Sequence, residues 1–213
     1  MQIDKTSWIM ANVEFGQNIE IGCFTVIGAQ LPKAWASPKN DITLIGNSCS
    51  IGNHVVIYEG SKISDECFID DYCRIGSDSI IGRNSMILYG AKIYQDVQIG
   101  KGCRIGGFCC NRTSIGNNVT MMGRLIHSYR EPFGEWSKNE VSPVVQDESI
   151  IGCGALIVGD VIIHKNSYVA AGAIVTKSVP SHHIAVGADI IHLEDWHGTL
   201  TSDIFFVEME NPY

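Results

Sequence analysis

Aliphatic residues return at every sixth position along most of this chain. Isoleucine fills each sixth position from Ile45 to Ile105 without a gap, and the same phase extends back through residues 27, 21, 15, 9 and 3. After Ile105 the phase shifts by four residues, and the regular period holds again from Val145 to Val175. A short fixed period indicates a solenoid in which each repeat packs only on its neighbours.

A second column of small or β-branched residues stands four positions after each aliphatic residue. Each six-residue unit is therefore predicted to form a short strand and a corner, and three units to close one triangular coil. The residue inside a corner must be compact, so we interpret a group of cysteines as core fillers rather than as disulfide or metal ligands. These are Cys49, Cys67, Cys73, Cys103 and Cys109.

Glycine and asparagine also recur with this period. Glycine often follows the aliphatic residue directly, as at Gly46 and Gly82, and asparagine often comes next, as at Asn47 and Asn117. Both residue types tolerate positive φ better than others do. We therefore expect them to form the sharp corners between strands.

Three segments depart from the repeat. Residues 29–41 occupy about one coil of chain and are interpreted as an edge cap, or as part of a ligand pocket or subunit contact. Residues 128–144 form a long loop, which in a compact repeat tends to be functional, and Arg130, Glu135 and Trp136 are its candidate substrate-binding residues. Residues 181–213 form a tail that is expected to cover the end of the solenoid, because open strand edges need covering. The predicted organisation is one β-helix domain, 1–180, followed by a tail or cap, 181–213.

Charge and hydropathy narrow the classes of partner. The chain has a net charge of −8 and no cluster of Lys or Arg, which argues against nucleic acid or an anionic membrane as partners. No apolar run reaches the ~18 residues of a membrane span, and the first residues lack the layout of a signal peptide. We predict a cytoplasmic location.

His127 stands out among the residues that interrupt the pattern. It follows Met121 by six positions, in a slot that the repeat would fill with an aliphatic residue, at the point where the long loop begins. From its spacing alone, His127 is either a hydrogen-bonding anchor of that loop or a catalytic group.

The repeat over residues 3–28 and 42–180 resembles that of the hexapeptide-repeat acyltransferase superfamily, including its sugar and xenobiotic O-acetyltransferases. The order of segments is also similar: LIHSY at 125–129, SPVVQDESIIG at 142–152 and the closing AAGAIVTKSVP at 170–180. The resemblance implies an all-β, left-handed parallel β-helix that assembles as a homotrimer. It also implies His127 as general base, with direct transfer from acetyl-CoA.

The resemblance further implies where acetyl-CoA binds, on the outer wall of the last coils between neighbouring subunits. Thr176 and Lys177 would lie near the nucleotide and its phosphates. The pantetheine arm would be lined by Gly154, Ala155, Ala171 and Ala173. Ala155 and Ala173 also fit the repeat as simple corner fillers, so both interpretations stay open for them.

The predicted function is an acetyl-CoA-dependent acetyltransferase acting on a hydroxyl or amine of a sugar, glycan or sugar nucleotide. One alternative is a xenobiotic acetyltransferase of the streptogramin or chloramphenicol type. The other is a non-catalytic β-helix assembly module in which His127 is structural. No metal is expected. A zinc site of three histidines is disfavoured because only His164 and His182 lie one coil apart.

Overall fold

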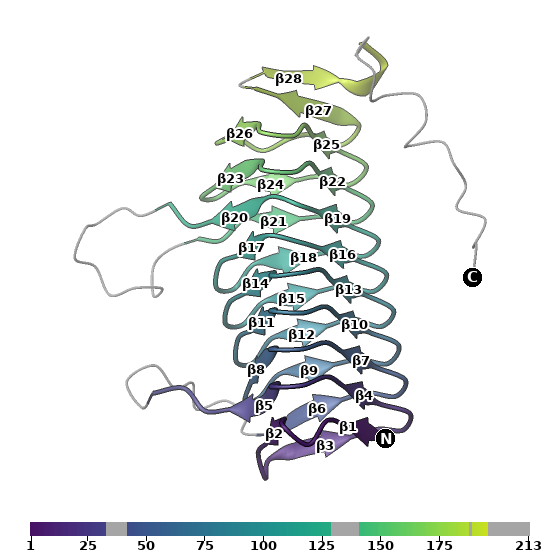
Figure 1. Ribbon diagram of the computed structural model, residues 1–213. Coiled ribbons are helices and arrows are strands. Elements are labelled where there is room, and N and C mark those ends of the chain that lie inside the picture. The colour runs from purple at the N-terminus through teal and green to yellow at the C-terminus, as the bar shows by residue number, and fades with distance from the viewer. Residues whose placement is uncertain (33–41, 129–140, 188, 196–213) are drawn as a thin grey trace.

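The computed structural model describes residues 1–32, 42–128, 141–187 and 189–195, and every structural statement below concerns these residues. Three sheets form the sides of a triangular prism whose coils rise from the N-terminus, at the bottom of Figure 1, to β28 at the top. We name these sides sheets A, B and C. Neighbouring strands within each sheet are parallel, apart from the last pair of sheet A, β27 and β28. The predicted fold class, an all-β parallel β-helix, is confirmed.

The chain visits the sheets in the order A, B, C in every coil. Sheet A contains β1 (Gln2–Ile3), β4 (Glu20–Ile21), β7 (Ser50–Ile51), β10 (Phe68–Ile69), β13 (Met86–Ile87), β16 (Arg104–Ile105), β19 (Thr120–Met121), β22 (Ile150–Ile151), β25 (Tyr168–Val169), β27 (His183–Val186) and β28 (Asp189–His192). Sheet B contains β2 (Trp8–Ile9), β5 (Val26–Ala29), β8 (Val56–Tyr58), β11 (Arg74–Ile75), β14 (Lys92–Ile93), β17 (Phe108–Cys109), β20 (Arg124–Ile126), β23 (Leu156–Val158) and β26 (Ile174–Val175). Sheet C contains β3 (Val13–Phe15), β6 (Thr43–Ile45), β9 (Lys62–Ile63), β12 (Ile80–Ile81), β15 (Gln98–Ile99), β18 (Ser114–Ile115), β21 (Val144–Val145) and β24 (Ile162–Ile163).

The isoleucine column forms the core of the prism. Ile75 of β11 pairs in register with Ile57 below it and Ile93 above it, and all three are fully buried. The equivalent ladders on sheets A and C bury their isoleucines in the same way. Each fully buried side chain of this size contributes about 1.5–3 kcal/mol. The six-residue period therefore reports the stacking of like residues directly.

Four cysteines fill corners as predicted: Cys49, Cys67, Cys73 and Cys103 are buried in the core cluster. All eight cysteines are free thiols, so no disulfide joins the coils. Burial raises the pKa of the Cys73 thiol to about 11, which keeps it protonated and neutral.

Cys109 also fills the core, as predicted, but it does not lie at a corner. Cys109 occupies a strand position of β17, where it pairs with Ile93 of β14 and Leu125 of β20. The reason is that only Gly106 and Gly107 separate β16 from β17, whereas regular corners are two residues longer. This tight corner accounts for the phase shift after Ile105. The next coil repeats it between β19 and β20.

Most glycines that follow the aliphatic residue are needed for space and not for backbone conformation. Gly46 and Gly82 have no positive φ, but a Cβ at Gly82 would lie 2.5 Å from the carbonyl carbon of Gly100 in the next coil. Positive φ falls two residues later, at Ser48 and Asn84 in these units. We expected Gly46 and Gly82 to be needed for positive φ, and this was wrong. They are needed because neighbouring coils approach too closely at these positions for a side chain.

Both long excursions leave from the edge between sheets B and C. Consecutive core positions are normally six residues apart, but Ile27 and Ile45 are 18 apart and Leu125 and Val145 are 20 apart. Each excursion therefore enlarges one corner. Ile27 and Ile45 are thus neighbouring core positions, one corner apart, although about one coil's length of chain separates them.

Sheet A continues past residue 180. β27 pairs in parallel with β25, and β28 then reverses direction and pairs antiparallel with β27, before a short 3-10 helix at Leu193–Asp195. This hairpin covers the C-terminal end of sheet A. Within the described residues, no helix has the length and hydropathy needed to cross a membrane.

Candidate functional site

His127 lies just beyond β20, at the edge where sheet B turns toward sheet C. Leu125, not His127, fills the aliphatic slot, because the tight corner before β20 advances the repeat by two residues. His127 is nonetheless only 5% exposed. The residue that begins the long loop is therefore an inward-held histidine at a corner.

Hydrogen bonds fix the imidazole of His127. Its Nε2 lies 3.1 Å from the carbonyl oxygen of Asn111, in the coil below, and 3.1 Å from Oγ of Ser142. The Ser142 hydroxyl donates its own proton to the same Asn111 oxygen at 2.5 Å. A carbonyl oxygen only accepts, so Nε2 must carry the proton that points at it. In a neutral ring, Nδ1 is then the basic nitrogen.

The backbone just before His127 is held by both neighbouring coils. The Cys110 N–H donates to the carbonyl of Leu125 at 3.0 Å, and the Gly159 N–H donates to the carbonyl of Ile126 at 2.9 Å. Gly159 has φ +83°, and a Cβ there would lie 2.9 Å from the side chain of Ser128. The site is thus built on stacked coils, which positions side chains more rigidly than a loop would.

The residues predicted to bind acetyl-CoA fall into three environments. Ala155 and Ala173 are buried in the core cluster, which agrees with the corner-filler interpretation and gives them no surface for a ligand. Gly154 and Ala171 are exposed at the edge between sheets A and B. Gly154 has φ +73°, and open space surrounds the position of its missing Cβ.

Thr176 and Lys177 are exposed at the opposite edge of sheet B, just after β26. They line a hollow of about 200 Å³ together with Gly187, Asp189 and other residues of the C-terminal hairpin. The Lys177 ammonium would attract a phosphate in this hollow, whereas the Asp189 carboxylate would repel it. Lys177, which we predicted to bind phosphate, thus lies in a hollow that contains both a positive and a negative side chain.

The three candidate substrate-binding residues, Arg130, Glu135 and Trp136, lie outside the described residues. No group of three His, Cys, Asp or Glu side chains in the described part of the chain is close enough to hold a metal ion.

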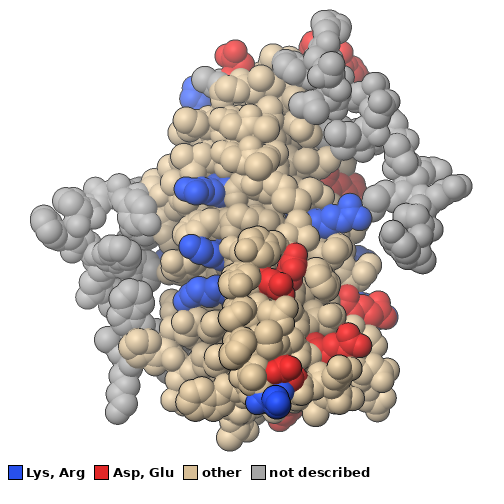
Figure 2. All heavy atoms as spheres, viewed as in Figure 1, with Lys and Arg blue, Asp and Glu red and all other residues tan. Residues whose placement is uncertain are grey.

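The outer face of sheet B carries a feature that was missed from the sequence. Arg74, Lys92 and Arg124 occupy equivalent outward positions on β11, β14 and β20. Figure 2 shows Lys and Arg groups stacked along the left side of the view, over sheet B, with Asp and Glu groups gathered toward the right. Arg74 and Lys92 are 18 residues apart, which is one coil, and Lys92 and Arg124 are 32 apart, which is two coils, so only the stacking of coils brings them into one column.

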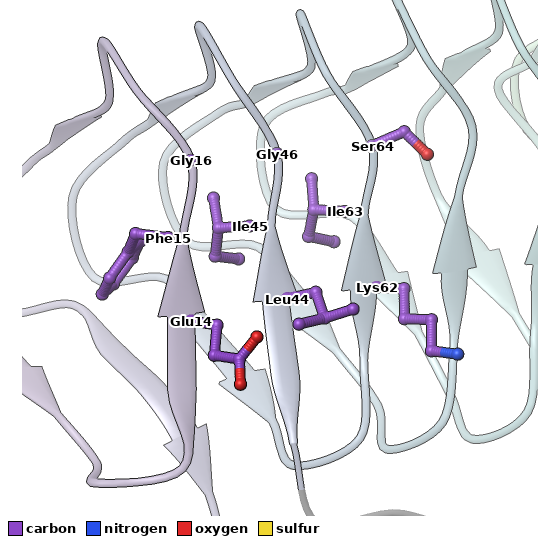
Figure 3. A pocket seen from close by; sticks show the side chains of 9 residues that line it. All are labelled: Glu14, Phe15, Gly16, Leu44, Ile45, Gly46, Lys62, Ile63 and Ser64. Carbon is purple, nitrogen blue, oxygen red and sulfur yellow. The ribbon is translucent and has the colours of Figure 1, made fainter.

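A larger hollow of about 460 Å³ lies on sheet C, far down the prism from His127. Figure 3 shows Glu14, Leu44 and Lys62 on the outer face of β3, β6 and β9, beside Gly16, Gly46 and Ser64. Its only ionisable lining side chains are those of Glu14 and Lys62, and it contains no histidine. We therefore assign the candidate site to His127.

Comparison with known proteins agrees with the repeat and the fold. Residues 78–110 match the family profile described as bacterial transferase hexapeptide (six repeats). The bifunctional protein GlmU of Clostridioides difficile (strain 630) is 25% identical over 193 residues, which are 84% of this chain and 31% of that protein. GlmU of Clostridium tetani is 33% identical over 98 residues, 40% of this chain and 22% of that protein. The chain thus spans about a third or less of the length of these curated relatives.

Two solved structures share the fold at low sequence identity. LpxA from Acinetobacter baumannii has a TM-score of 0.57 and 16% identity, over 91% of this chain and 76% of that one. A UDP-N-acetylglucosamine acyltransferase from Campylobacter jejuni has a TM-score of 0.50 and 18% identity, over the same shares. The solved structures share the parallel β-helix fold with this chain, and the profile match places hexapeptide repeats of the bacterial transferase type at residues 78–110.

Proposed function

We propose that this protein is an acyltransferase that moves an acetyl group from acetyl-CoA to a hydroxyl or amine of a sugar, glycan or sugar nucleotide. The observation that carries the proposal is the buried imidazole of His127, whose Nε2–H is fixed by Asn111 and Ser142. The Campylobacter jejuni neighbour, by name a UDP-N-acetylglucosamine acyltransferase, supports a sugar nucleotide as the class of acceptor.

The geometry suits direct transfer. Nδ1 of His127 takes the proton of the acceptor hydroxyl or amine while that oxygen or nitrogen bonds to the thioester carbonyl carbon. The tetrahedral intermediate then collapses, the carbon–sulfur bond breaks, and the imidazolium returns the proton to the leaving thiolate. Asn111 and Ser142 accept from the opposite ring nitrogen throughout, so they hold the ring in place while it carries a positive charge.

The positions of the exposed donor-binding candidates support a homotrimer. Gly154 and Ala171 lie at one edge of sheet B, while Thr176 and Lys177 lie at the other. One acetyl-CoA would touch both pairs only across sheet B, or in a groove where two subunits bring different edges together. We favour the groove, and light scattering should then give three times the mass of the chain. A monomeric mass would refute the groove.

The test is a thiol-release assay with acetyl-CoA and a panel of sugars, amino sugars, sugar nucleotides and antibiotics. His127→Ala should lower kcat by about 10²–10⁴-fold on the one accepted substrate, the usual contribution of a general base. His164→Ala is the matched control, because the imidazole of His164 hydrogen-bonds Gln146, just after β21, and contacts neither Asn111 nor Ser142.

Each other outcome has a meaning. Turnover that survives His127→Ala makes His127 structural and refutes the proposed mechanism. Turnover only with an antibiotic supports the xenobiotic acetyltransferase. The absence of both turnover and acetyl-CoA binding leaves the non-catalytic assembly module.

A further inference from the structure

Arg74, one of the three cations in the column on sheet B, is held in place by aromatic side chains. The Arg74 guanidinium carbon lies 4.6 Å from the ring centroid of Tyr58 and 4.7 Å from that of Tyr94. Tyr94 in turn contacts Phe108 of the next coil, with ring centroids 5.0 Å apart. Gly76 has no side chain at the outward position between Tyr58 and Tyr94, which leaves room for Arg74 to lie between the rings.

This packing presents Arg74 as a ready anion receptor. Its guanidinium carbon lies over two tyrosine rings, and one N–H donates to the Ile93 carbonyl at 3.2 Å. A guanidinium has five N–H donors in one plane, so the remaining donors lie at its edge. A stacked guanidinium loses little conformational freedom when it binds a carboxylate or phosphate.

The column has no anionic partner within the described part of the protein. Arg83 forms an ion pair with Glu66, but Arg74, Lys92 and Arg124 contact no carboxylate there. The outward positions of all nine sheet B strands contain no Asp or Glu. In a chain with net charge −8, three cations without counter-ions on one face indicate a surface for an anionic ligand.

The length of the column limits the ligand. Adjacent coils are about 4.8 Å apart, so Arg74 and Lys92 are about 5 Å apart and Arg124 lies about 10 Å beyond Lys92. A single phosphate or diphosphate reaches two of these side chains but not all three. The upper end of the column, at Arg124, precedes His127 by three residues on the same strand and corner.

We propose that sheet B binds an acidic saccharide of several units, aligned along Arg74, Lys92 and Arg124 with one end at His127. The cations pair with its carboxylates or phosphates, and the half-buried rings of Tyr58, Tyr94 and Phe108 contact its sugar rings. This inference rests on the proposed function only in naming the acceptor class, because binding along the column requires no acyl transfer.

The test measures binding without acetyl-CoA. Calorimetry would compare oligogalacturonates of increasing length with neutral malto-oligosaccharides of the same lengths. We expect binding of the acidic series only, tightening with length until the chain spans the column, and weakening as salt is added. Equal binding of the neutral series, or no binding of either, overturns the proposal.

Variants then locate the site. Arg74→Gln, Lys92→Gln and Arg124→Gln should each weaken binding about two- to fivefold, the range for an exposed ion pair, and the triple variant at least about tenfold. Arg104→Gln on sheet A is the matched control and should bind as the wild type does. Lys92→Gln is the variant least expected to disturb folding, because Lys92 takes no part in the ring contacts. A loss of binding in this variant therefore reports the lost charge. Unchanged binding in the triple variant, or a change in oligomeric state caused by it, overturns the proposal.

The experiments distinguish failure of the proposed function from failure of the proposed saccharide site. Acidic saccharide that binds along the column without any turnover contradicts the proposed function and keeps the inference. Turnover of small neutral sugars, with no binding of acidic chains, contradicts the inference alone.

Discussion

The hydroxyl of Ser142 offers a sharp test of how His127 is held. Its Oγ lies 3.1 Å from Nε2 of His127 and donates to the Asn111 carbonyl at 2.5 Å. In Ser142→Ala the ring still donates to Asn111 but loses its second acceptor and the lateral support of the hydroxyl. A typical hydrogen bond contributes about 0.5–1.5 kcal/mol, which corresponds to about a two- to twelvefold loss of rate.

The loss should appear in kcat and not in KM, because Ser142 contacts the base from behind. Steady-state kinetics on the accepted substrate would measure both. Ser142→Thr keeps the hydroxyl and should recover most of the rate.

Ser149→Ala is the matched control. The Ser149 hydroxyl is also buried and donates to a backbone carbonyl, that of His164, at 2.9 Å. Thermal unfolding should show a similar loss of stability in the two alanine variants, with a loss of kcat only in Ser142→Ala. Equal kinetic losses at both positions would show that general loosening, and not support of His127, is responsible.

Three further predictions concern the coils. Gly82→Ala should lower the free energy of unfolding by about 1–3 kcal/mol in denaturant titrations, since the new Cβ meets the backbone of Gly100. A thiol reagent should label Cys153, which is exposed, within minutes in the native protein, and all eight cysteines only after unfolding; rapid native labelling of six or more would contradict the packing. The pKa of Cys73 is raised from its ordinary value of 9.0 to about 11, so the unfolded state releases this proton first and stability should fall between about pH 9 and 11. Melting temperatures over that range should fall less steeply for Cys73→Ala than for the wild type.

The repeat made most of the fold predictable. Its isoleucines stack on themselves, so a linear period in the sequence becomes a vertical ladder in space, as for Ile57, Ile75 and Ile93. Corner details were less predictable, because they depend on contacts between coils. A glycine is needed at position 82 because the backbone of Gly100, 18 residues away, leaves no room for a side chain. No local sequence pattern indicates that contact.

The candidate site was predictable in its main residue and not in its surroundings. His127 interrupts the repeat visibly, but its partners Asn111 and Ser142 lie 16 and 15 residues away and carry no motif. The column of Arg74, Lys92 and Arg124 was missed for the same reason. Each is an ordinary outward residue in the sequence, and only the stacking of coils brings the three together. A search of the sequence at coil spacing, for charges and not only for aliphatic residues, would have found it.

The two tight corners have a consequence for how this chain tolerates length changes. Gly107 of the first corner faces the carbonyl of Gly123 in the second so closely that a Cβ at Gly107 would overlap it, and Gly123 meets Ala155 above in a similar way. Restoring the two missing residues in either coil would remove this close contact between Gly107 and Gly123. A length change at the second corner would also alter the entry to β20, the strand that leads directly to His127.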